Sequence, residues 1–334
     1  MPLAYHNADK AETQELIKEL QKRFAIKELG ALTQVLGLRV TRDRRRRTLV
    51  VDQTAATNKV LKAFGFGSGV RTEHVPARVG IKLPALGAPS AEVASKRSAE
   101  AERSTLTVAN FISLVGALLY IAGKTRPDIA YAVGVLSRYT SQPTAEILEL
   151  GKQVLRYLAG TASLGVTFSY QPDGLTLYGF SDSDWAADYS SGKSVSGVVF
   201  MLAGGPVSWR STKQTTVALS SSEAEYVAAS EAAREVSFLR MLLAELGIAQ
   251  PNATVLFMDN QTSIKFVEEE GCTPRRKHIN VKHHFIREKF MAGIIKPVWI
   301  PTAENVADIL TKPLPRSSFE LLREIILGRA AAAK

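Results

Sequence analysis

The chain has 334 residues, 46% of them hydrophobic and 22% charged, which is typical of globular proteins and excludes a wholly disordered chain. Its length predicts two domains. Lysine and arginine outnumber aspartate and glutamate by 42 to 32, and the net charge of +10 favours a polyanionic partner such as nucleic acid. The single cysteine, Cys272, excludes an internal disulfide and a cysteine-rich zinc site, so we expect an intracellular setting. The longest apolar run, residues 111–122, is too short to span a bilayer, and no membrane partner is expected.

The N-terminal part of the chain predicts a small α+β unit. Apolar residues at helical spacing predict a helix over residues 11–28, and alternating stretches predict strands over 33–40 and 48–51. Between the two strands lies a basic run from Arg42 to Arg47 that contains five arginines. Both a solvated turn and a hairpin tip that grips phosphate are consistent with this run.

A linker and a helical region follow. Residues 67–104 are rich in Ala, Ser, Gly, Pro and Glu and lack periodicity, which predicts a long irregular connection. Helices are then predicted over residues 106–122, from Pro127 onwards, and over 145–159. Together these segments indicate a helical subdomain.

The C-terminal half predicts a mixed α/β fold with a five-stranded sheet. The five expected strands are residues 175–180, 197–202, 207–211, 254–258 and 294–300. Short glycine-rich connections join the first three as an antiparallel meander, whereas the later strands alternate with helices and should pair in parallel. A last helix is expected over 319–327.

Two aspartates lie where the first of these strands is expected to end. Asp182 and Asp184 share one face of the strand, because strand side chains alternate, and the spacing does not decide between them. An edge of this kind can carry a functional site. A turn or cap built from Asp and Ser is the structural alternative.

A long helix is predicted from about Ser222, and one acid heads its apolar stripe. The stripe consists of Glu225, Ala228, Ala232, Val236, Leu239, Leu243 and Leu246. A buried carboxylate needs a cation or hydrogen bonds, so Glu225 is a candidate metal ligand. Glu223 is rotated by about 200° on the helix and should face away. A contact with the helix dipole is the alternative role for either glutamate.

Two further acids complete the candidate set. Asp259 follows the strand over 254–258, at the carboxyl end where sites of α/β proteins collect. Asp308 is expected early in the last helix of the sheet domain. Converging carboxylates repel each other unless cations lie among them, and an oxygen-only ligand set selects Mg²⁺ or Mn²⁺. We therefore expect two such ions, which together support phosphodiester hydrolysis, and no small-molecule cofactor.

Five ordered segments of the C-terminal half carry a specific resemblance. They are SDSDWAADYSSGKSVSG (181–197), VSWRSTKQTTVALSSSEAEYVA (207–228), MDNQTSI (258–264), RRKHINVKHHFIRE (275–288) and NVADILTKPL (305–314). These segments resemble the C-terminal part of copia-type retrotransposon Pol polyproteins. The resemblance implies a ribonuclease H-like mixed sheet that cuts the RNA strand of an RNA/DNA hybrid. It also implies that the catalytic and metal-binding acids are Asp182, Glu225, Asp259 and Asp308.

The N-terminal half resembles the downstream part of the reverse transcriptase of the same family. The matching segments are RFAIKELGALTQVLGLRV (23–40), LVGALLYIAGKTRPDIAYAVGVLSR (114–138) and LRYLAGT (155–161). The family's polymerase core carries an aromatic-X-Asp-Asp motif, and no Asp-Asp pair occurs in this chain. We therefore expect no polymerase activity. The resemblance divides the chain into a palm-end remnant (1–66), a linker (67–104), a thumb- or connection-like region (105–170), a ribonuclease H domain (171–315) and a C-terminal helix and tail (316–334).

Basic and polar side chains around these acids are candidate contacts to nucleic acid. They are Arg210, Lys213, Asn260, Gln261, Arg275, Arg276, Lys277 and His278. A solvated helix face is the alternative for the run from 275 to 278. The expected partners are an RNA/DNA hybrid and other parts of the polyprotein, in a cytoplasmic particle or the nucleus. The alternative function is a catalytically silent fragment that only binds nucleic acid.

Overall fold

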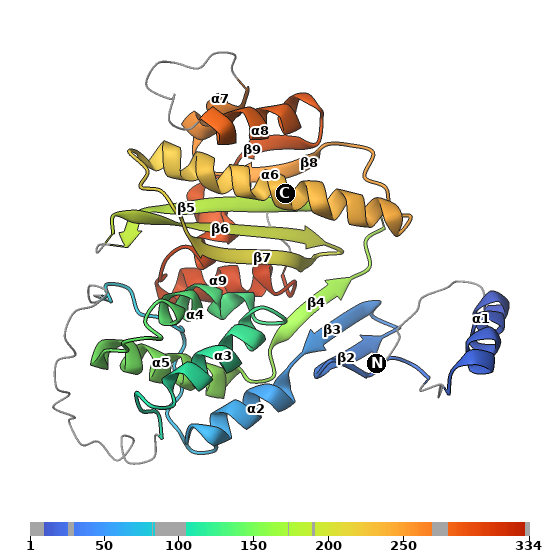
Figure 1. The fold of residues 1–334 in the computed structure, drawn as a ribbon, viewed down its shortest axis with the longest axis horizontal. Helices are drawn as coiled ribbons and strands as arrows, with labels where there is room; N and C mark the ends of the chain where they lie inside the picture. The colour runs from blue at the N-terminus through green and yellow to red at the C-terminus, as the bar shows by residue number, and fades with distance from the viewer. Residues whose placement is uncertain are drawn as a thin grey trace.

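The computed structural model describes residues 10–25, 30–81, 83, 105–172, 174–188, 191–268 and 280–330. Within them a large sheet, a small sheet and a layer of helices form the body (Figure 1). The large sheet has the order β7-β6-β5-β8-β9 and the small one the order β1-β2-β3-β4. The strands of the large sheet are β5 (Tyr178–Asp188), β6 (Lys193–Leu202), β7 (Gly205–Lys213), β8 (Thr254–Met258) and β9 (Ile295–Trp299). The strands of the small sheet are β1 (Gln34–Val35), β2 (Leu38–Asp43), β3 (Thr48–Asp52) and β4 (Gly165–Ser169).

The predicted mixed five-stranded sheet is confirmed. Strands β5, β6 and β7 form the antiparallel meander, and β8 and β9 join β5 in parallel. The predicted end of the first strand is wrong, because β5 continues as far as Asp188. Its polar residues pair with β6 through Asp184, and the register shifts only beyond that residue. The polar residues from Ser181 to Asp184 suggested a turn. In the structure they stay in the strand, because they pair with β6.

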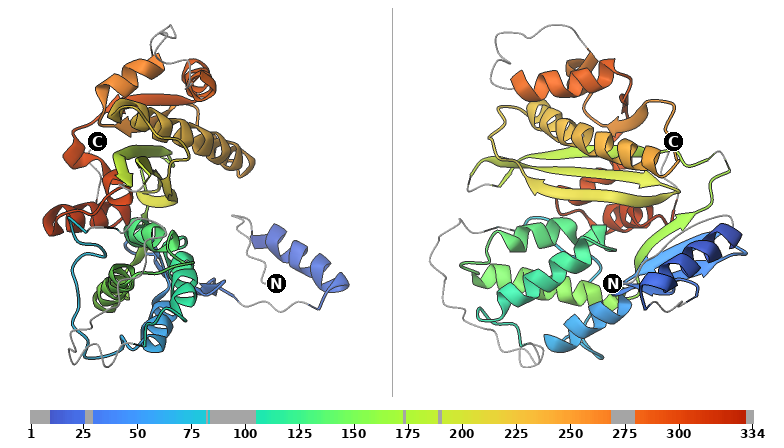
Figure 2. Two further views of the ribbon diagram at one scale, coloured as in Figure 1. Left: turned by 60° about the vertical axis from the view of Figure 1, so that its left-hand side comes forward. Right: turned by 45° about the vertical axis from the view of Figure 1, so that its right-hand side comes forward.

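Helices cover both faces of the large sheet (Figures 1 and 2). One face packs against α6 (Ser221–Glu245), α7 (Gln261–Glu268) and α8 (Asn280–Met291). The other face contacts the 3₁₀ helix η4 (Val306–Leu310) and the helix α4 (Ala130–Ser137). The core on this side continues into η1 (Pro127–Ile129), α3 (Phe111–Ala122), α5 (Ala145–Thr161) and α9 (Arg316–Ile326). Val198 and Val199 of β6 join opposite cores, as the period of two in a strand requires. The predicted helical subdomain therefore packs directly on the large sheet.

The small sheet contains an element that the sequence did not predict. Strand β4, which follows α5, pairs antiparallel with β3. Helix α2 (Thr54–Ala63) was also not predicted. The strand expected over 33–40 is interrupted by a turn at Leu36 and Gly37, both with positive φ, and is thereby split into β1 and β2.

In Figure 1 and in the left view of Figure 2, helix α1 (Lys10–Arg23) stands clear of the rest of the described chain. The predicted helix over 11–28 is confirmed to Arg23, and residues 26–29 lie outside the described residues. Residues 67–81 contain neither helix nor strand, as expected of a connection, while 84–104 also lie outside. The domain boundaries after residues 66, 104, 170 and 315 stay predictions.

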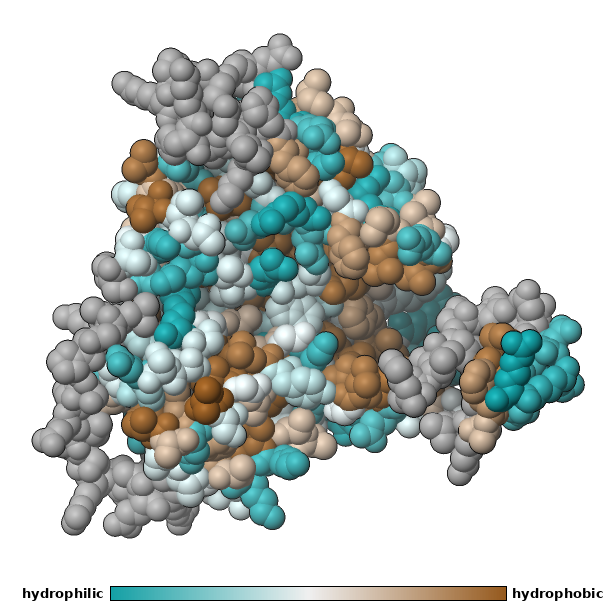
Figure 3. All heavy atoms as spheres, viewed as in Figure 1, coloured by the Kyte–Doolittle hydropathy of each residue, from teal (hydrophilic) through white to brown (hydrophobic). Residues whose placement is uncertain are grey.

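The surface of α6 changes character along the helix. The predicted stripe is buried from Glu225 to Leu243, but Leu246 is 64% exposed because the helix ends at Glu245. Exposed Phe238 and Met241 add to this apolar end, and hydrophobic atoms gather there in Figure 3. Among the described residues, no helix combines the length and the apolar character needed to cross a bilayer.

Candidate active site

Two strands bring two of the predicted acids to the same end of the sheet. Phe180 of β5 pairs with Phe257 of the parallel strand β8, so Asp182 and Asp259 each lie two residues further along their strands. Glu225, in the first turns of α6, reaches the same place. Carboxylate oxygens of these three residues lie within 4.8 Å of one another. Three of the four predicted acids therefore form one cluster.

Two hydrogen bonds that resemble a capping box form the start of α6 at this cluster. Ser220 Oγ accepts a hydrogen bond from the Glu223 amide (3.2 Å), and Glu223 Oε2 accepts one from the Leu219 amide (2.8 Å). Glu225 turns to the sheet, where its Oε1 accepts a bond from the Ser183 amide (3.1 Å). The prediction that the two glutamates face different ways is confirmed.

Gln214 fixes the start of α6 against the sheet, and sequence reasoning missed it. Its Nε2 donates to the carbonyl oxygen of Ala224 (2.9 Å) and to Ser196 Oγ (3.0 Å), and the side chain is buried. Because Ala224 precedes Glu225, these bonds hold the glutamate in place. The signal available in the sequence was that Gln214 lies within the segment 207–228, which carries the family resemblance.

The fourth acid, Asp308, lies beside the cluster in η4 rather than in the expected α-helix. The Asn305 side chain caps η4 by accepting from the Ala307 amide (3.2 Å) and donates to the carbonyl oxygen of Ser181 (3.1 Å). Gly197, which pairs with Asp182, allows this close approach, because a Cβ there would lie 2.7 Å from the Ala307 carbonyl oxygen. The segment is thereby held against β5 and β6.

Two residues after η4 contact the acids directly, and neither was predicted. Thr311 Oγ1 donates to Asp182 Oδ2. Lys312 Nζ lies 2.8 Å from Asp308 Oδ1, four residues earlier in the chain. Both residues belong to the segment NVADILTKPL, so the family resemblance was the only signal for them.

Burial and mutual repulsion raise the pKa values of the acids. Burial, together with the Asp308 carboxylate, raises the pKa of Asp182 to about 7. Burial, with Asp182 and Asp259, raises the pKa of Glu225 to about 10. Burial also raises the pKa values of Asp259 and Asp308. The Lys312 ammonium opposes each of these shifts without cancelling them, so the site is short of positive charge.

These residues fit a hard divalent cation. Oxygen is the only donor type in the cluster, and hard cations such as Mg²⁺ and Mn²⁺ prefer oxygen ligands. Glu225 Oε2 is buried and has no hydrogen-bond partner among the described residues. A bound cation would satisfy this oxygen and relieve the repulsion that raises the pKa values.

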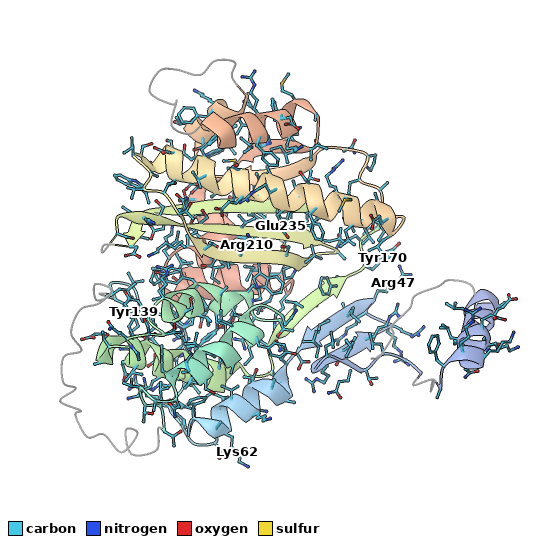
Figure 4. All side chains as sticks on the ribbon, viewed as in Figure 1. Arg47, Lys62, Tyr139, Tyr170, Arg210 and Glu235 are labelled. Carbon is cyan, nitrogen blue, oxygen red and sulfur yellow. The ribbon has the colours of Figure 1, made fainter. Side chains whose placement is uncertain are left out.

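The predicted contacts to nucleic acid have different surroundings. Arg210 is exposed on the edge strand β7, 3.9 Å from Glu235 (Figure 4). Lys213 is less available, since its Nζ lies 2.7 Å from Asp188 Oδ2. Asn260 Oδ1 caps α7 by accepting from the Ser263 amide (3.0 Å). Gln261 is exposed at the start of α7, whereas Arg275, Arg276, Lys277 and His278 lie outside the described residues.

Sequence comparison finds relatives along almost the whole chain, although no family model matches. The chain is 36% identical over 318 residues to the retrovirus-related Pol polyprotein from transposon TNT 1-94 of Nicotiana tabacum, covering 95% of this chain and 23% of that protein. It is 33% identical over 309 residues to the corresponding polyprotein from transposon RE1 of Arabidopsis thaliana, covering 91% of this chain and 19% of that protein. The chain thus spans about a fifth of the length of these curated relatives.

Among solved structures, the chain is similar to LC11-RNase H1, isolated from compost by a metagenomic approach. The identity is 21%, the TM-score is 0.31, and the match covers 41% of this chain and 92% of that one. Because the TM-score is below 0.5, the family assignment comes from the sequence matches alone. Those matches confirm the predicted resemblance: the chain belongs to the Pol polyproteins of copia-type retrotransposons.

Proposed function

We propose that this chain hydrolyses the RNA strand of RNA/DNA hybrids with the help of two divalent metal ions. The observation that carries the proposal is the cluster of Asp182, Glu225 and Asp259, which includes a buried Glu225 oxygen without a partner among the described residues. Membership of the Pol polyproteins supports a role in retrotransposon replication. The net charge of +10 suits a polyanionic substrate.

The four acids would hold the ions, and their neighbours would orient the acids. Asp182, Glu225 and Asp259 supply the central ligands, with Asp308 beside them. The Thr311 hydroxyl and the Ser183 amide fix the carboxylates of Asp182 and Glu225. When bound, the two ions would supply an activated water and stabilise the leaving oxygen, so the chain needs no covalent nucleophile.

A cleavage assay tests the proposal. The purified chain is incubated with an RNA/DNA hybrid labelled on either strand, with Mg²⁺ or Mn²⁺, and with chelator or double-stranded DNA as controls. We expect metal-dependent loss of the RNA strand only. Asp182→Asn must abolish the activity, which excludes a contaminating nuclease. Hybrid binding without cleavage at any metal concentration would instead favour the silent nucleic-acid-binding fragment.

A further inference from the structure

The arginine run of the N-terminal sheet forms an exposed hairpin tip between β2 and β3. Arg42, Arg44, Arg45, Arg46 and Arg47 are all exposed. The acid within the run builds the turn, since Asp43 Oδ1 accepts from the amides of Arg45 and Arg46 (both 2.9 Å). Asp43 also pairs loosely with Arg46, at 3.8 Å. The tip therefore presents a dense positive charge to solvent.

This tip is attached firmly to the sheet that carries the acids. The Tyr170 amide donates to the carbonyl oxygen of Arg47 (3.0 Å), and Arg47 lies over the Tyr170 ring at 4.6 Å (Figure 4). One residue earlier, the Ser169 amide of β4 donates to the carbonyl oxygen of Ala203, in the turn between β6 and β7 (2.7 Å). Gly205 allows β4 this close approach, because a Cβ there would lie 2.3 Å from the Thr167 carbonyl oxygen. The arginines thus have a defined position relative to the large sheet.

That position is at the other end of the large sheet from the acids. Asp182 pairs with Gly197, and Ala203 lies six residues further along the chain, roughly 20 Å away at about 3.3 Å per residue. A nucleic-acid duplex is straight over this length, because its persistence length is about 150 base pairs. At about 3.4 Å per base pair, a duplex lying along the strands would extend from the acids to the tip within roughly 6–9 base pairs.

We propose that the arginine hairpin tip is a second binding surface for the phosphate backbone of the duplex whose RNA strand is cut at the acids. The inference rests on the proposed function for the placement of the duplex. Guanidinium groups suit this role, since each presents several donors to phosphate oxygens. The tip adds affinity without sequence preference, because it contacts backbone only.

Binding in chelator tests the tip independently of cleavage. A labelled hybrid of about 24 base pairs is titrated over a salt series with wild type, Arg44→Gln/Arg45→Gln and the matched control Lys59→Gln/Lys62→Gln. The control removes the same charge from α2, where Lys62 lies well away from Arg47 (Figure 4). We expect the arginine variant to flatten the slope of log K against log salt by about two units, and the control to leave it unchanged.

Several results would overturn the proposal. Equal losses in the two double variants would make the effect one of net charge, and no loss in either would return the tip to a solvated turn. If vesicles of phosphatidylserine bind the tip and hybrid binding is unaffected by its loss, the partner is a membrane surface. Unchanged thermal unfolding of each variant confirms its fold, and Arg45→Glu, which reverses one charge, repeats the test independently.

A length series separates this inference from the proposed function. With Mg²⁺, kcat/KM of Arg44→Gln/Arg45→Gln should fall for a hybrid of about 24 base pairs. It should stay at the wild-type value for a loop-closed hybrid of about 5 base pairs, which is shorter than the roughly 6–9 base pairs needed to bridge both surfaces. If the arginine substitutions leave cleavage of both hybrids unchanged, the proposal for the tip is wrong and the proposed function is unaffected. If the wild type does not cleave but the arginine variant shows the flattened slope of log K against log salt, the proposed function is wrong and the proposal for the tip is supported.

Discussion

Lys312 and Asp308 form an ion pair at the edge of the acidic cluster, with Nζ 2.8 Å from Oδ1. Burial lowers the pKa of Lys312, but the Asp182 and Asp308 carboxylates outweigh it and raise the value overall. The lysine is therefore charged and supplies a positive charge from within the chain. In the metal-free protein this charge partly offsets the repulsion among the carboxylates.

We expect Lys312→Met to destabilise the metal-free protein and to strengthen Mg²⁺ binding. Removing the ammonium leaves Asp308 without its counter-charge, at a cost of about 1–3 kcal/mol, and also removes a charge that repels the incoming ion. Thermal unfolding in chelator and calorimetric titration with Mg²⁺ measure the two effects. Lys312→Arg, which keeps the charge, is the control. Weaker Mg²⁺ binding in Lys312→Met would mean that the lysine organises the site instead of competing with the ion.

Metal-free stability should fall as pH rises. The pKa of Asp182 is raised to about 7 in the folded protein, whereas an unfolded aspartate has a value of about 3.9. Between these values the folded state holds a proton that the unfolded state has lost, so the free energy of unfolding decreases with pH across this window. Glu225, with a pKa of about 10, extends the decrease to higher pH.

Thermal unfolding in chelator from about pH 5 to about pH 8 checks this expectation. Saturating Mg²⁺ should remove the decrease, because the bound ion replaces the protons. Asp182→Asn should reduce it in chelator, since asparagine does not titrate. A melting temperature that rises with pH in chelator would show that folding does not raise the pKa values of these carboxylates.

The large sheet and the central acids could be predicted because they follow short-range patterns. Strand alternation, the helical stripe headed by Glu225 and the position of Asp259 after a buried strand are all visible locally. The length of β5 was not, since its extension through Asp182 depends on pairing with β6. Strand β4 was missed for the same reason: five residues after a helix become a strand only by pairing with β3.

The groups that orient the acids were beyond prediction from local pattern. Thr311 contacts Asp182 across 129 positions of the chain, and Gln214 holds the start of α6 from the end of β7. Neither the spacing of apolar residues around them nor their neighbours in the sequence indicate such a contact. Only the fold brings them together, and the same holds for the join between the arginine hairpin and the large sheet.

We expect no templated DNA synthesis by this chain. Family polymerases hold their metals with a pair of adjacent aspartates, and the sequence contains no such pair. Primer extension on a labelled template with nucleotides and Mg²⁺ measures this. Any template-dependent extension by the purified chain would show that the N-terminal half is more than a remnant of the polymerase.

The two glutamates at the start of α6 offer a matched pair of variants. Glu225→Gln keeps the shape of the side chain but removes the charge that would hold the ion, and cleavage should fall at least about a hundredfold. Glu223→Gln should leave cleavage within a few-fold of wild type. The side-chain oxygen of the glutamine can still accept a hydrogen bond from the Leu219 amide. The cap at the start of α6 is therefore kept, and the free energy of unfolding falls by at most about 1 kcal/mol.

Stability in chelator should move in the opposite direction from activity for Glu225→Gln. The folded wild type must take up a proton on Glu225 at neutral pH, because burial and the neighbouring acids raise its pKa to about 10. Glutamine removes this requirement, so the melting temperature should rise by roughly 2–4 °C near pH 8 and by less near pH 5. Glu223→Gln should show no such rise. Equal loss of cleavage in both variants, or a loss confined to Glu223→Gln, would contradict the assignment of Glu225 to the metal site.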